Sequence, residues 1–445
     1  MTLLAAAAVR DITPAPGAAM SGYAARTEPA RGMHDPLTLR VLVVGSTALV
    51  SADVVGLDAS TCRRIRQRCA GLAEVVVHAT HTHGGPVSMP GRLGGDCDLE
   101  WLHSVEDAAV EAVREAVRAL QPVTVVPWSS PGPSVATNRR RAGGTVDPLL
   151  PGLALVGADG DCVATVVSYA CHPVVLGADN LLFTADYPGP LRRRIEDEIG
   201  GLAFFLTGCA GDANPGQVQV DPASASSGGG RSFADCAEVG EQLAEAALAG
   251  LREVRRRSSP WSVGSGGSEL TEASLHRLPV TVEFAVPGIE ALQAEVERWH
   301  HAVEVARDAQ ERALYSCWQQ WARGKLEAAA RADLDTDTDT DTGDGGPQRW
   351  AGTVAVLRWG PARILALPGE PFAGTGMQLR RRLGVPTAMV AGYCDGCPGY
   401  LPPREEYPFG GYEVQDAHRY YGAPGPFAPG AAETLLDAAL RLPVN

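Results

Sequence analysis

Lysine is almost absent from the chain, and positive charge is in deficit. Lys325 is the only lysine among 445 residues, and 38 basic residues face 52 acidic ones, which gives a formal net charge of −14. General affinity for nucleic acids comes from basic surfaces that attract the phosphate backbone. An acidic chain starts from repulsion instead, so we expect no nucleic-acid partner.

Long apolar runs and export signals are also lacking. No run approaches the roughly 18 apolar residues of a membrane-spanning helix, so we expect no membrane span. The apolar start, Met1 to Val9, has no basic region before it and continues at once into Arg10 and Asp11, which predicts a first strand of the fold. Without export, we expect a cytoplasmic protein whose ten cysteines are free thiols.

Strands and helices alternate in the first half of the chain. Short β-branched runs predict strands at 74–78, 162–169 and 202–206, and apolar residues three and four apart predict a helix at 100–120. This alternation is typical of α/β or mixed α+β proteins. At roughly 150 residues per domain the length suggests about three units, although single large α/β enzymes often reach this size.

Two consecutive segments differ from that pattern. Residues 287–332 mix Glu and Arg with Leu, Ala and Trp, which predicts a helical insertion packed on one side of the core. Residues 333–347 follow, with six aspartates between 333 and 344. A calcium loop needs a glycine and a terminal glutamate that this register lacks, so a disordered acidic linker is predicted.

The densest group of chemistry-bearing side chains follows the strand predicted at 74–78. His78, His81 and His83 lie in the run Val-His-Ala-Thr-His-Thr-His-Gly-Gly-Pro. Residues two apart in extended backbone point to the same side, so His81 and His83 can address one centre. Imidazole is a common ligand of zinc and related metals, and the group predicts a metal or catalytic site.

Three further segments place polar residues after apolar strands. His172 follows the strand predicted at 162–169, and Glu370 follows a Pro-Gly turn. This glutamate is either an ordinary helix-start acid or the anionic ligand of a two-histidine site. Asn214 lies in the turn Gly-Asp-Ala-Asn-Pro, whose backbone N–H groups could hold an oxyanion, although these residues are also plain turn chemistry.

Taken in order, these segments resemble the catalytic domain of the neutral, non-lysosomal ceramidase family. The matching motifs are collinear and cover most of residues 10–415. They are Asp11-Ile12-Thr13-Pro14, Ser21-Gly22-Tyr23, Met33 to Leu37, Ser51-Ala52-Asp53, Thr80 to Pro86, Asn138-Arg139, His172-Pro173, Ala185 to Gly189, Gly211 to Pro215, Pro368-Gly369-Glu370, Glu405-Glu406-Tyr407 and Tyr412-Glu413.

The resemblance implies a single large catalytic domain of mixed α/β class over residues 1–445, which holds one zinc ion per chain and hydrolyses an amide. By motif, it assigns four zinc ligands, which are His81, His172, Glu370 and Tyr400. Zinc lowers the pKa of a bound water from about 15.7 toward 7 and polarises a carbonyl. The ligand set is therefore consistent with amide hydrolysis by a metal-activated water.

The same resemblance places three more residues along the reacting amide. His83 would shuttle a proton, and Arg139 or Tyr412 would stabilise the oxyanion that develops on the carbonyl. The chain departs from the family at Asn214, where the family carries a serine proposed to act at the amide. A side-chain amide is no acyl nucleophile, so an acyl-enzyme at that position is excluded, although Asn214 can still donate a hydrogen bond.

Two other departures bear on the substrate. The sequence ends soon after the tyrosine motifs, so we expect no counterpart of the family's C-terminal immunoglobulin-like domain, and export is not evident. We therefore predict a zinc-dependent amidohydrolase that acts on a soluble small-molecule amide. The alternatives are amide formation, cyclisation or transfer at the same zinc site in a natural-product biosynthetic pathway, a true ceramidase, and a ligand-binding pseudoenzyme.

Overall fold

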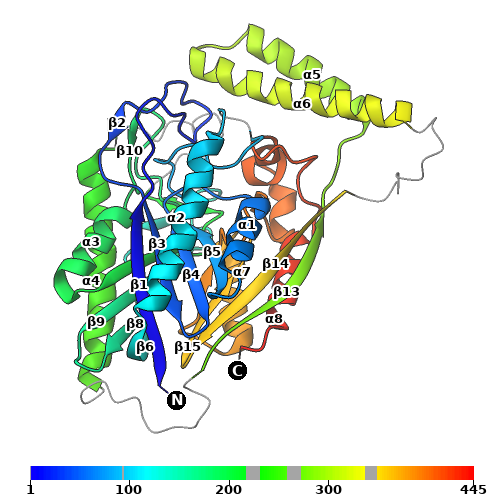
Figure 1. The fold of residues 1–445 in the computed structure, drawn as a ribbon. Coiled ribbons are helices and arrows are strands. Elements are labelled where there is room, and N and C mark those ends of the chain that lie inside the picture. The colour runs from blue at the N-terminus through cyan, green and yellow to red at the C-terminus, as the bar shows by residue number, and fades with distance from the viewer. Residues whose placement is uncertain (1, 93–94, 217–230, 258–271, 336–347, 445) are drawn as a thin grey trace.

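The computed structural model describes residues 2–92, 95–216, 231–257, 272–335 and 348–444 (Figure 1). Most of the linker predicted at 333–347 lies outside these ranges. The two central layers of the molecule are β-sheets, and helices cover the outer face of each.

An eight-stranded mixed sheet contains the predicted strands of the first half. The strand order is β11-β9-β8-β6-β1-β3-β4-β5, with parallel pairs at both edges and antiparallel pairs between them. The strands are β1 (Leu3–Asp11), β3 (Thr38–Val44), β4 (Thr47–Ala52), β5 (Glu74–Ala79), β6 (Gln121–Pro131), β8 (Leu149–Gly157), β9 (Cys162–Tyr169) and β11 (Leu202–Thr207).

A four-stranded sheet packs against one face of the large sheet. Its order is β13-β14-β15-β17, from β13 (Ala273–Glu283), β14 (Arg349–Trp359), β15 (Ala362–Ala366) and β17 (Met389–Ala391). Successive strand residues point to opposite faces, which explains the two apolar sides of β3. Leu42 and Val44 pack in the layer between the sheets, whereas Val41 and Val43 pack against helices.

Six helices cover the outer faces. The far face of the large sheet carries α1 (Ala59–Cys69), α2 (Leu99–Arg118), α3 (Pro188–Ile199) and α4 (Phe233–Arg257), and the small sheet carries α7 (Ala373–Leu383) and α8 (Ala431–Leu440). Both α1 and α2 begin at an aspartate, Asp58 or Asp98, whose carboxylate accepts from the first-turn N–H groups. The prediction of a mixed α/β fold is confirmed.

Helices α5 (Ile289–Glu304) and α6 (Ala309–Asp335) form a separate hairpin (Figure 1). It lies apart from the two sheets, at one end of the molecule. Three short helical turns occur later in the chain, at η3 (Arg404–Phe409), η4 (Tyr412–Asp416) and η5 (Ala417–Arg419), and η5 contacts the hairpin through the ion pair of Arg419 with Glu295. None of the described helices combines the length and the apolar character that a bilayer crossing requires.

The two edges of the large sheet meet at the end that carries the polar motifs. The backbone N–H of Thr207 in β11 donates to Nε2 of His78 in β5 at 3.2 Å, and the Thr207 hydroxyl donates to the carbonyl of Thr80. His78 also contacts the Ser51 hydroxyl at 3.0 Å. This histidine therefore joins strands inside the core, and the segments after β5, β9 and β11 converge.

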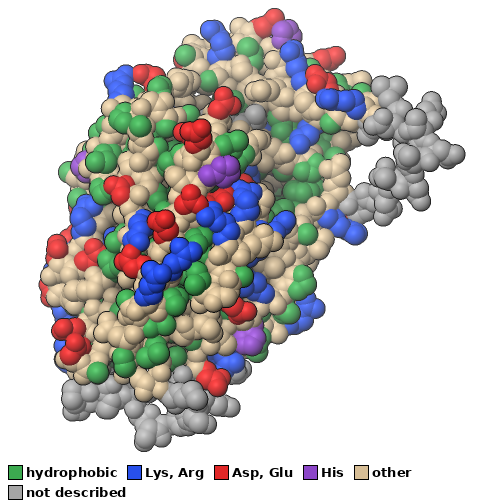
Figure 2. All heavy atoms as spheres, in the orientation of Figure 1, with side chains coloured by type: hydrophobic (Ala, Val, Ile, Leu, Met, Phe, Trp, Pro, Cys, Tyr) green, Lys and Arg blue, Asp and Glu red, His purple; other side chains and the backbone are tan. Residues whose placement is uncertain are grey.

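Charged side chains on the surface are of mixed sign. Figure 2 shows acidic and basic groups interspersed over the visible face. Helices α1 and α2 exchange ion pairs, such as Arg64 with Glu106 and Arg68 with Asp107. All ten cysteines are described, and each is a free thiol, as the sequence predicts.

Candidate metal centre

His81 reaches the site from an unusual backbone conformation. β5 ends at Ala79, and His81 has a φ of 66°, in the left-handed region that residues other than glycine rarely adopt. The expectation of extended backbone at this residue is wrong. A left-handed residue is retained where the surrounding contacts fix it, often at functional sites. Here the His81 N–H donates to the Val54 carbonyl at 2.9 Å, and Nδ1 contacts the Val55 carbonyl.

His172 follows β9 and is also fixed through its Nδ1 atom. The ring is completely buried, and Nδ1 lies 3.1 Å from the carbonyl oxygen of Ala213. A carbonyl oxygen only accepts, so we assign the ring proton of both His81 and His172 to Nδ1. When the rings are neutral, each Nε2 atom therefore carries a lone pair. Burial, and secondarily Arg139, lowers the pKa of His172 to about 4, which keeps this ring neutral near pH 7.

Glu370 faces both of those lone pairs. Its Oε2 atom lies 3.0 Å from Nε2 of His172 and 3.3 Å from Nε2 of His81. The residue is completely buried in β16 (Glu370–Pro371), which pairs with β18 (Tyr400–Leu401). Burial alone would raise the pKa of the Glu370 carboxyl, but positive charge beside it, on the rings of His81 and His172 or on a cation bound between them, lowers it below its ordinary range. The carboxylate is therefore ionised.

His83 completes a group of three imidazoles. Its Nε2 atom lies 3.3 Å from Nε2 of His81, and the ligand atoms of His81, His83 and His172 all lie within 4.8 Å of one another. Burial, and then the neighbouring His81 and His172, lowers the pKa of His83. A Cβ atom at Gly22 would lie 2.4 Å from Cγ of His83, so only glycine allows this close packing.

These contacts fit a divalent cation. With both rings neutral, two Nε2 lone pairs and a carboxylate oxygen converge with no proton between them, and such an arrangement is repulsive unless a cation lies at its centre. Backbone carbonyls on the opposite ring nitrogens are the usual outer partners of metal-binding histidines. Imidazole and carboxylate donors together suit zinc.

Tyr400 lies beside this centre and contacts Arg139. The Tyr400 ring is stacked toward His172 with a centroid distance of 6.4 Å, and the Arg139 guanidinium lies 5.2 Å from its centroid. Burial raises the pKa of the Tyr400 hydroxyl, and Arg139 opposes that rise. Tyr412 begins η4, and its ring lies 5.8 Å from that of Tyr400.

Arg139 presents one donor that lacks a well-aligned partner. Nε donates to Oε1 of Glu413 at 2.7 Å, and Nη1 approaches Oδ1 of Asn214 at 3.4 Å. Nη2 is buried and has no well-aligned hydrogen-bond partner among the described residues, although the Tyr400 hydroxyl interacts with the guanidinium. A buried guanidinium N–H without a partner is costly unless a ligand accepts from it.

Two tyrosines that the sequence did not single out touch Glu370. The Tyr393 hydroxyl donates to Oε2 at 3.4 Å and its ring stacks on His81 at 4.2 Å, whereas the Tyr421 hydroxyl donates to Oε1. Tyr393 has a left-handed φ of 55°. Tyr393 directly precedes the turn Cys394-Asp395-Gly396-Cys397. An aromatic residue beside such a turn is the one sequence signal that could have marked Tyr393 as a site residue.

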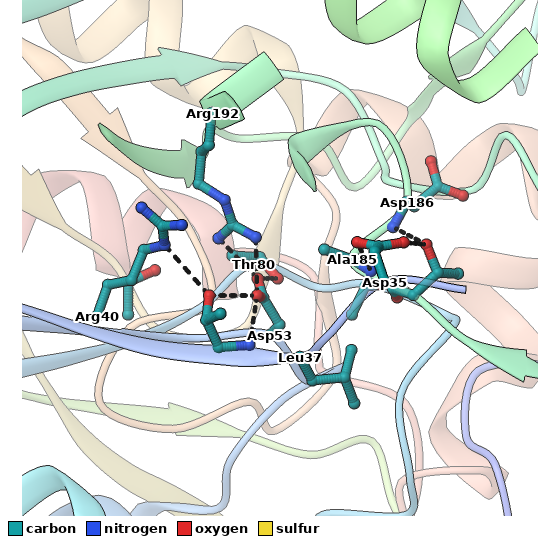
Figure 3. A network of polar contacts seen from close by, with 12 residues as sticks. Asp35, Leu37, Arg40, Asp53, Thr80, Ala185, Asp186 and Arg192 are labelled. Atoms are coloured by element: carbon teal, nitrogen blue, oxygen red, sulfur yellow. Dashed lines mark hydrogen bonds and ion pairs between the residues drawn. The ribbon is translucent and has the colours of Figure 1, made fainter. Parts of the chain in front are cut away.

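A buried ion pair is hydrogen-bonded to the residue that precedes His81. Arg192 of α3 donates through Nη1 and Nη2 to the two oxygens of Asp53, at 2.9 and 2.8 Å. Thr80, the residue before His81, donates to the same carboxylate at 3.1 Å (Figure 3). Asp53 is thereby joined to the turn that carries the histidine.

Solved structures of known proteins share this architecture. A neutral ceramidase from Pseudomonas aeruginosa has a TM-score of 0.68, and a ceramidase complexed with C2 has a TM-score of 0.69. The chain has a ceramidase-like fold. Each alignment covers 100% of this chain and 76% of the other at 18% sequence identity, a level at which the likeness shows the fold alone. No protein-family model and no curated protein sequence matches the chain.

The structure brings the predicted site residues into one neighbourhood. His81, His83, His172 and Glu370 are in direct contact, and Tyr400, Arg139, Asn214 and Tyr412 are connected to them by the ring and hydrogen-bond contacts above. Their individual roles remain predictions. His78, the third histidine of the sequence cluster, faces Ser51 and Thr207 instead.

Proposed function

We propose that the protein is a zinc-dependent amidohydrolase with one zinc ion per chain. The observation that carries the proposal is the convergence of Nε2 of His81 and His172 on the Glu370 carboxylate, with each Nδ1 against a backbone carbonyl. We assign Tyr400 as the fourth ligand, since β18 places it beside Glu370. When bound, zinc polarises a carbonyl and lowers the pKa of a water molecule toward 7.

The chain's own residues would bind and orient the amide. Nη2 of Arg139 is a charged donor with no well-aligned protein acceptor among the described residues, which suits a developing oxyanion. Asn214 presents its Oδ1 to Arg139, so its amide N–H groups are free to donate toward the same oxygen. The hydroxyl of Tyr412, whose pKa burial raises above 10, stays protonated and is a further donor.

His83 is the proposed proton carrier. Its Nδ1 atom is buried without a hydrogen-bond partner in the described part of the chain, and its pKa is lowered by burial. A neutral imidazole can accept a proton from the attacking water and deliver it to the leaving amine. Arg26 fixes the residue, because its Nη1 donates to the His83 carbonyl at 2.9 Å.

For the substrate we favour a soluble small-molecule amide in the cytoplasm. Asn214 supports an alternative reaction at the same site. The ceramidase family carries a serine at this position, whereas the side-chain amide of Asn214 can donate a hydrogen bond but cannot act as a nucleophile. That alternative is amide formation, cyclisation or transfer in a biosynthetic pathway. The two ceramidase structures make ceramide a further candidate.

The test combines metal analysis with turnover in H₂¹⁸O. The purified chain is assayed for zinc content, then incubated with a panel of N-acyl amino acids and N-acyl amines, and with ceramide in detergent. We expect about one zinc per chain and one ¹⁸O atom in the released acid. Turnover without ¹⁸O incorporation would favour the non-hydrolytic alternative, and a metal-free, inactive chain would contradict the proposal.

A further inference from the structure

We propose that helix α6 takes part in the metal centre through Tyr421. In this relay, two side chains of α6 hold the backbone after Tyr421, and the Tyr421 hydroxyl sets the orientation of the Glu370 carboxylate. Tyr421 and the α6 residues are positioning residues, because they act on the zinc only through Glu370. The inference rests on the zinc site proposed above and extends it to a helix outside the sheet core.

The first step of the relay depends on the different partners that the two oxygens of Glu370 contact. Oε2 faces His81, His172 and the hydroxyl of Tyr393. On the other side of the carboxylate, Oε1 accepts from Tyr421. A carboxylate is planar, so a donor on Oε1 fixes the rotation of the group and keeps Oε2 toward the two imidazoles. Outer partners that orient a ligand in this way usually raise metal affinity.

The Tyr421 ring is held by neighbours on more than one side. The Arg92 guanidinium lies 4.7 Å from its centroid, and the Tyr400 ring meets it edge-on at 6.2 Å. A Cβ atom added to Gly399 would lie 3.5 Å from the ring. The aromatic ring is thus confined, but these contacts do not determine where the backbone that carries it lies.

The second step fixes that backbone. Nζ of Lys325 donates to the carbonyl of Gly422 at 2.8 Å, and Nε1 of Trp321 donates to the carbonyl of Ala423 at 2.8 Å. Both donors come from α6, four residues apart and therefore on one face of the helix. They bind the carbonyl groups of the two residues that follow Tyr421. The single lysine of the chain is one of them, and burial lowers its pKa.

The hairpin itself is anchored just before Tyr421. The Arg419 guanidinium lies 5.6, 5.3 and 5.3 Å from the ring centroids of Trp299, Trp318 and Trp321. It also pairs with Glu295 of α5 at 2.8 Å. Cation–π and ion-pair contacts of a buried arginine are geometrically demanding. The hairpin therefore holds the chain on both sides of Tyr421.

The experiment measures zinc affinity of the metal-free protein by competition with a chromogenic chelator. Tyr421→Phe removes only the hydroxyl, and we expect zinc to bind about 10- to 100-fold more weakly. Lys325→Met removes one α6 donor, and an effect of about 2- to 30-fold is expected for a residue that acts through an intermediate. Lys325→Arg keeps a donor and should recover part of the loss.

Tyr407→Phe is the matched control. The Tyr407 hydroxyl donates to the carbonyls of Phe427 and Ala428, in the same C-terminal region but away from Glu370. This variant should bind zinc like the wild type. Cobalt substitution gives a second readout, since a rotated carboxylate changes the visible absorption bands in Tyr421→Phe and not in Tyr407→Phe.

The outcomes separate the relay from the zinc site. If the wild type binds zinc and Tyr421→Phe matches Tyr407→Phe in affinity and cobalt spectrum, the relay is overturned and the zinc site stands. If Tyr421→Phe is weakened but Lys325→Met is not, the part played by α6 is overturned. A wild type without zinc affinity overturns the site and the relay together.

Discussion

Asp53 and Glu370 are both completely buried carboxylates, yet their surroundings are opposite in kind. Asp53 has a guanidinium on both oxygens and accepts hydrogen bonds from Thr38 and Thr80 as well. Glu370 has two imidazole nitrogens and two tyrosine hydroxyls around it. The described residues offer it no arginine or lysine within ion-pair distance.

The difference separates a structural charge from a functional one. Burial alone would raise the pKa of Asp53, but Arg192 and the hydrogen bonds lower it, so the charge of Asp53 is matched permanently inside the fold. The charge of Glu370 is balanced only when a cation binds between its carboxylate and the two histidines. A buried carboxylate of the second kind has a counter-charge that is not part of the chain, and a metal ion meets that requirement.

The largest expected effect follows from neutralising Glu370. We expect Glu370→Gln to lower zinc affinity by more than the roughly 100-fold that an outer partner can contribute, and to abolish turnover. The metal-free variant should unfold at the same free energy as the metal-free wild type or a higher one, because a buried charge without a permanent partner is gone. Zinc titration and urea unfolding of both metal-free proteins measure this.

The opposite response is expected at Asp53. Asp53→Asn leaves Arg192 buried without its counter-charge, so the free energy of unfolding should fall by about 3–5 kcal/mol. Urea unfolding of the metal-free proteins, with Asp107→Asn on the exposed face of α2 as the control, checks this value. Equal losses of stability in Asp53→Asn and Glu370→Gln would remove the distinction between the two carboxylates.

A substitution of Arg139 tests whether its buried Nη2 donor contributes to turnover. Arg139→Gln should reduce kcat by about 10²- to 10³-fold, the usual effect of losing one oxyanion donor, and should leave zinc content unchanged. Arg141→Gln is the control, because the half-exposed Arg141 pairs with Glu406 and stacks on Phe409. A loss that appears only in KM would instead assign Arg139 to ground-state binding.

Much of this architecture could be predicted from the sequence, because local patterns specify it. The strand at 162–169 is found at the predicted residues as β9, and the three motifs that end in His81, His172 and Glu370 do converge. β13 (Ala273–Glu283) escaped prediction, because Pro279 and the polar pair His276 and Arg277 interrupt its apolar residues.

The support of the site could not be predicted in the same way. Tyr421 lies 51 residues from Glu370 in the chain, and no local pattern links the two. The left-handed conformation of His81 is set by the carbonyls of Val54 and Val55, which belong to another segment. Such features depend on tertiary contacts, whereas periodicity reports only on neighbours along the chain.

The smallest expected effect is at Thr80, and it tests whether the Asp53 carboxylate influences the metal centre. Thr80 donates a hydrogen bond to Asp53 and directly precedes His81, so it connects the Asp53–Arg192 ion pair to the metal centre. Thr80→Val keeps the shape and removes one hydrogen bond, which should cost about 0.5–1.5 kcal/mol in the free energy of unfolding. Zinc affinity should stay unchanged, because the carbonyls of Val54 and Val55 hold His81 independently of Asp53. A zinc affinity that falls together with stability would mean that the Asp53–Arg192 pair also orients His81, and Asp53 would then belong to the support of the metal as well as to the core.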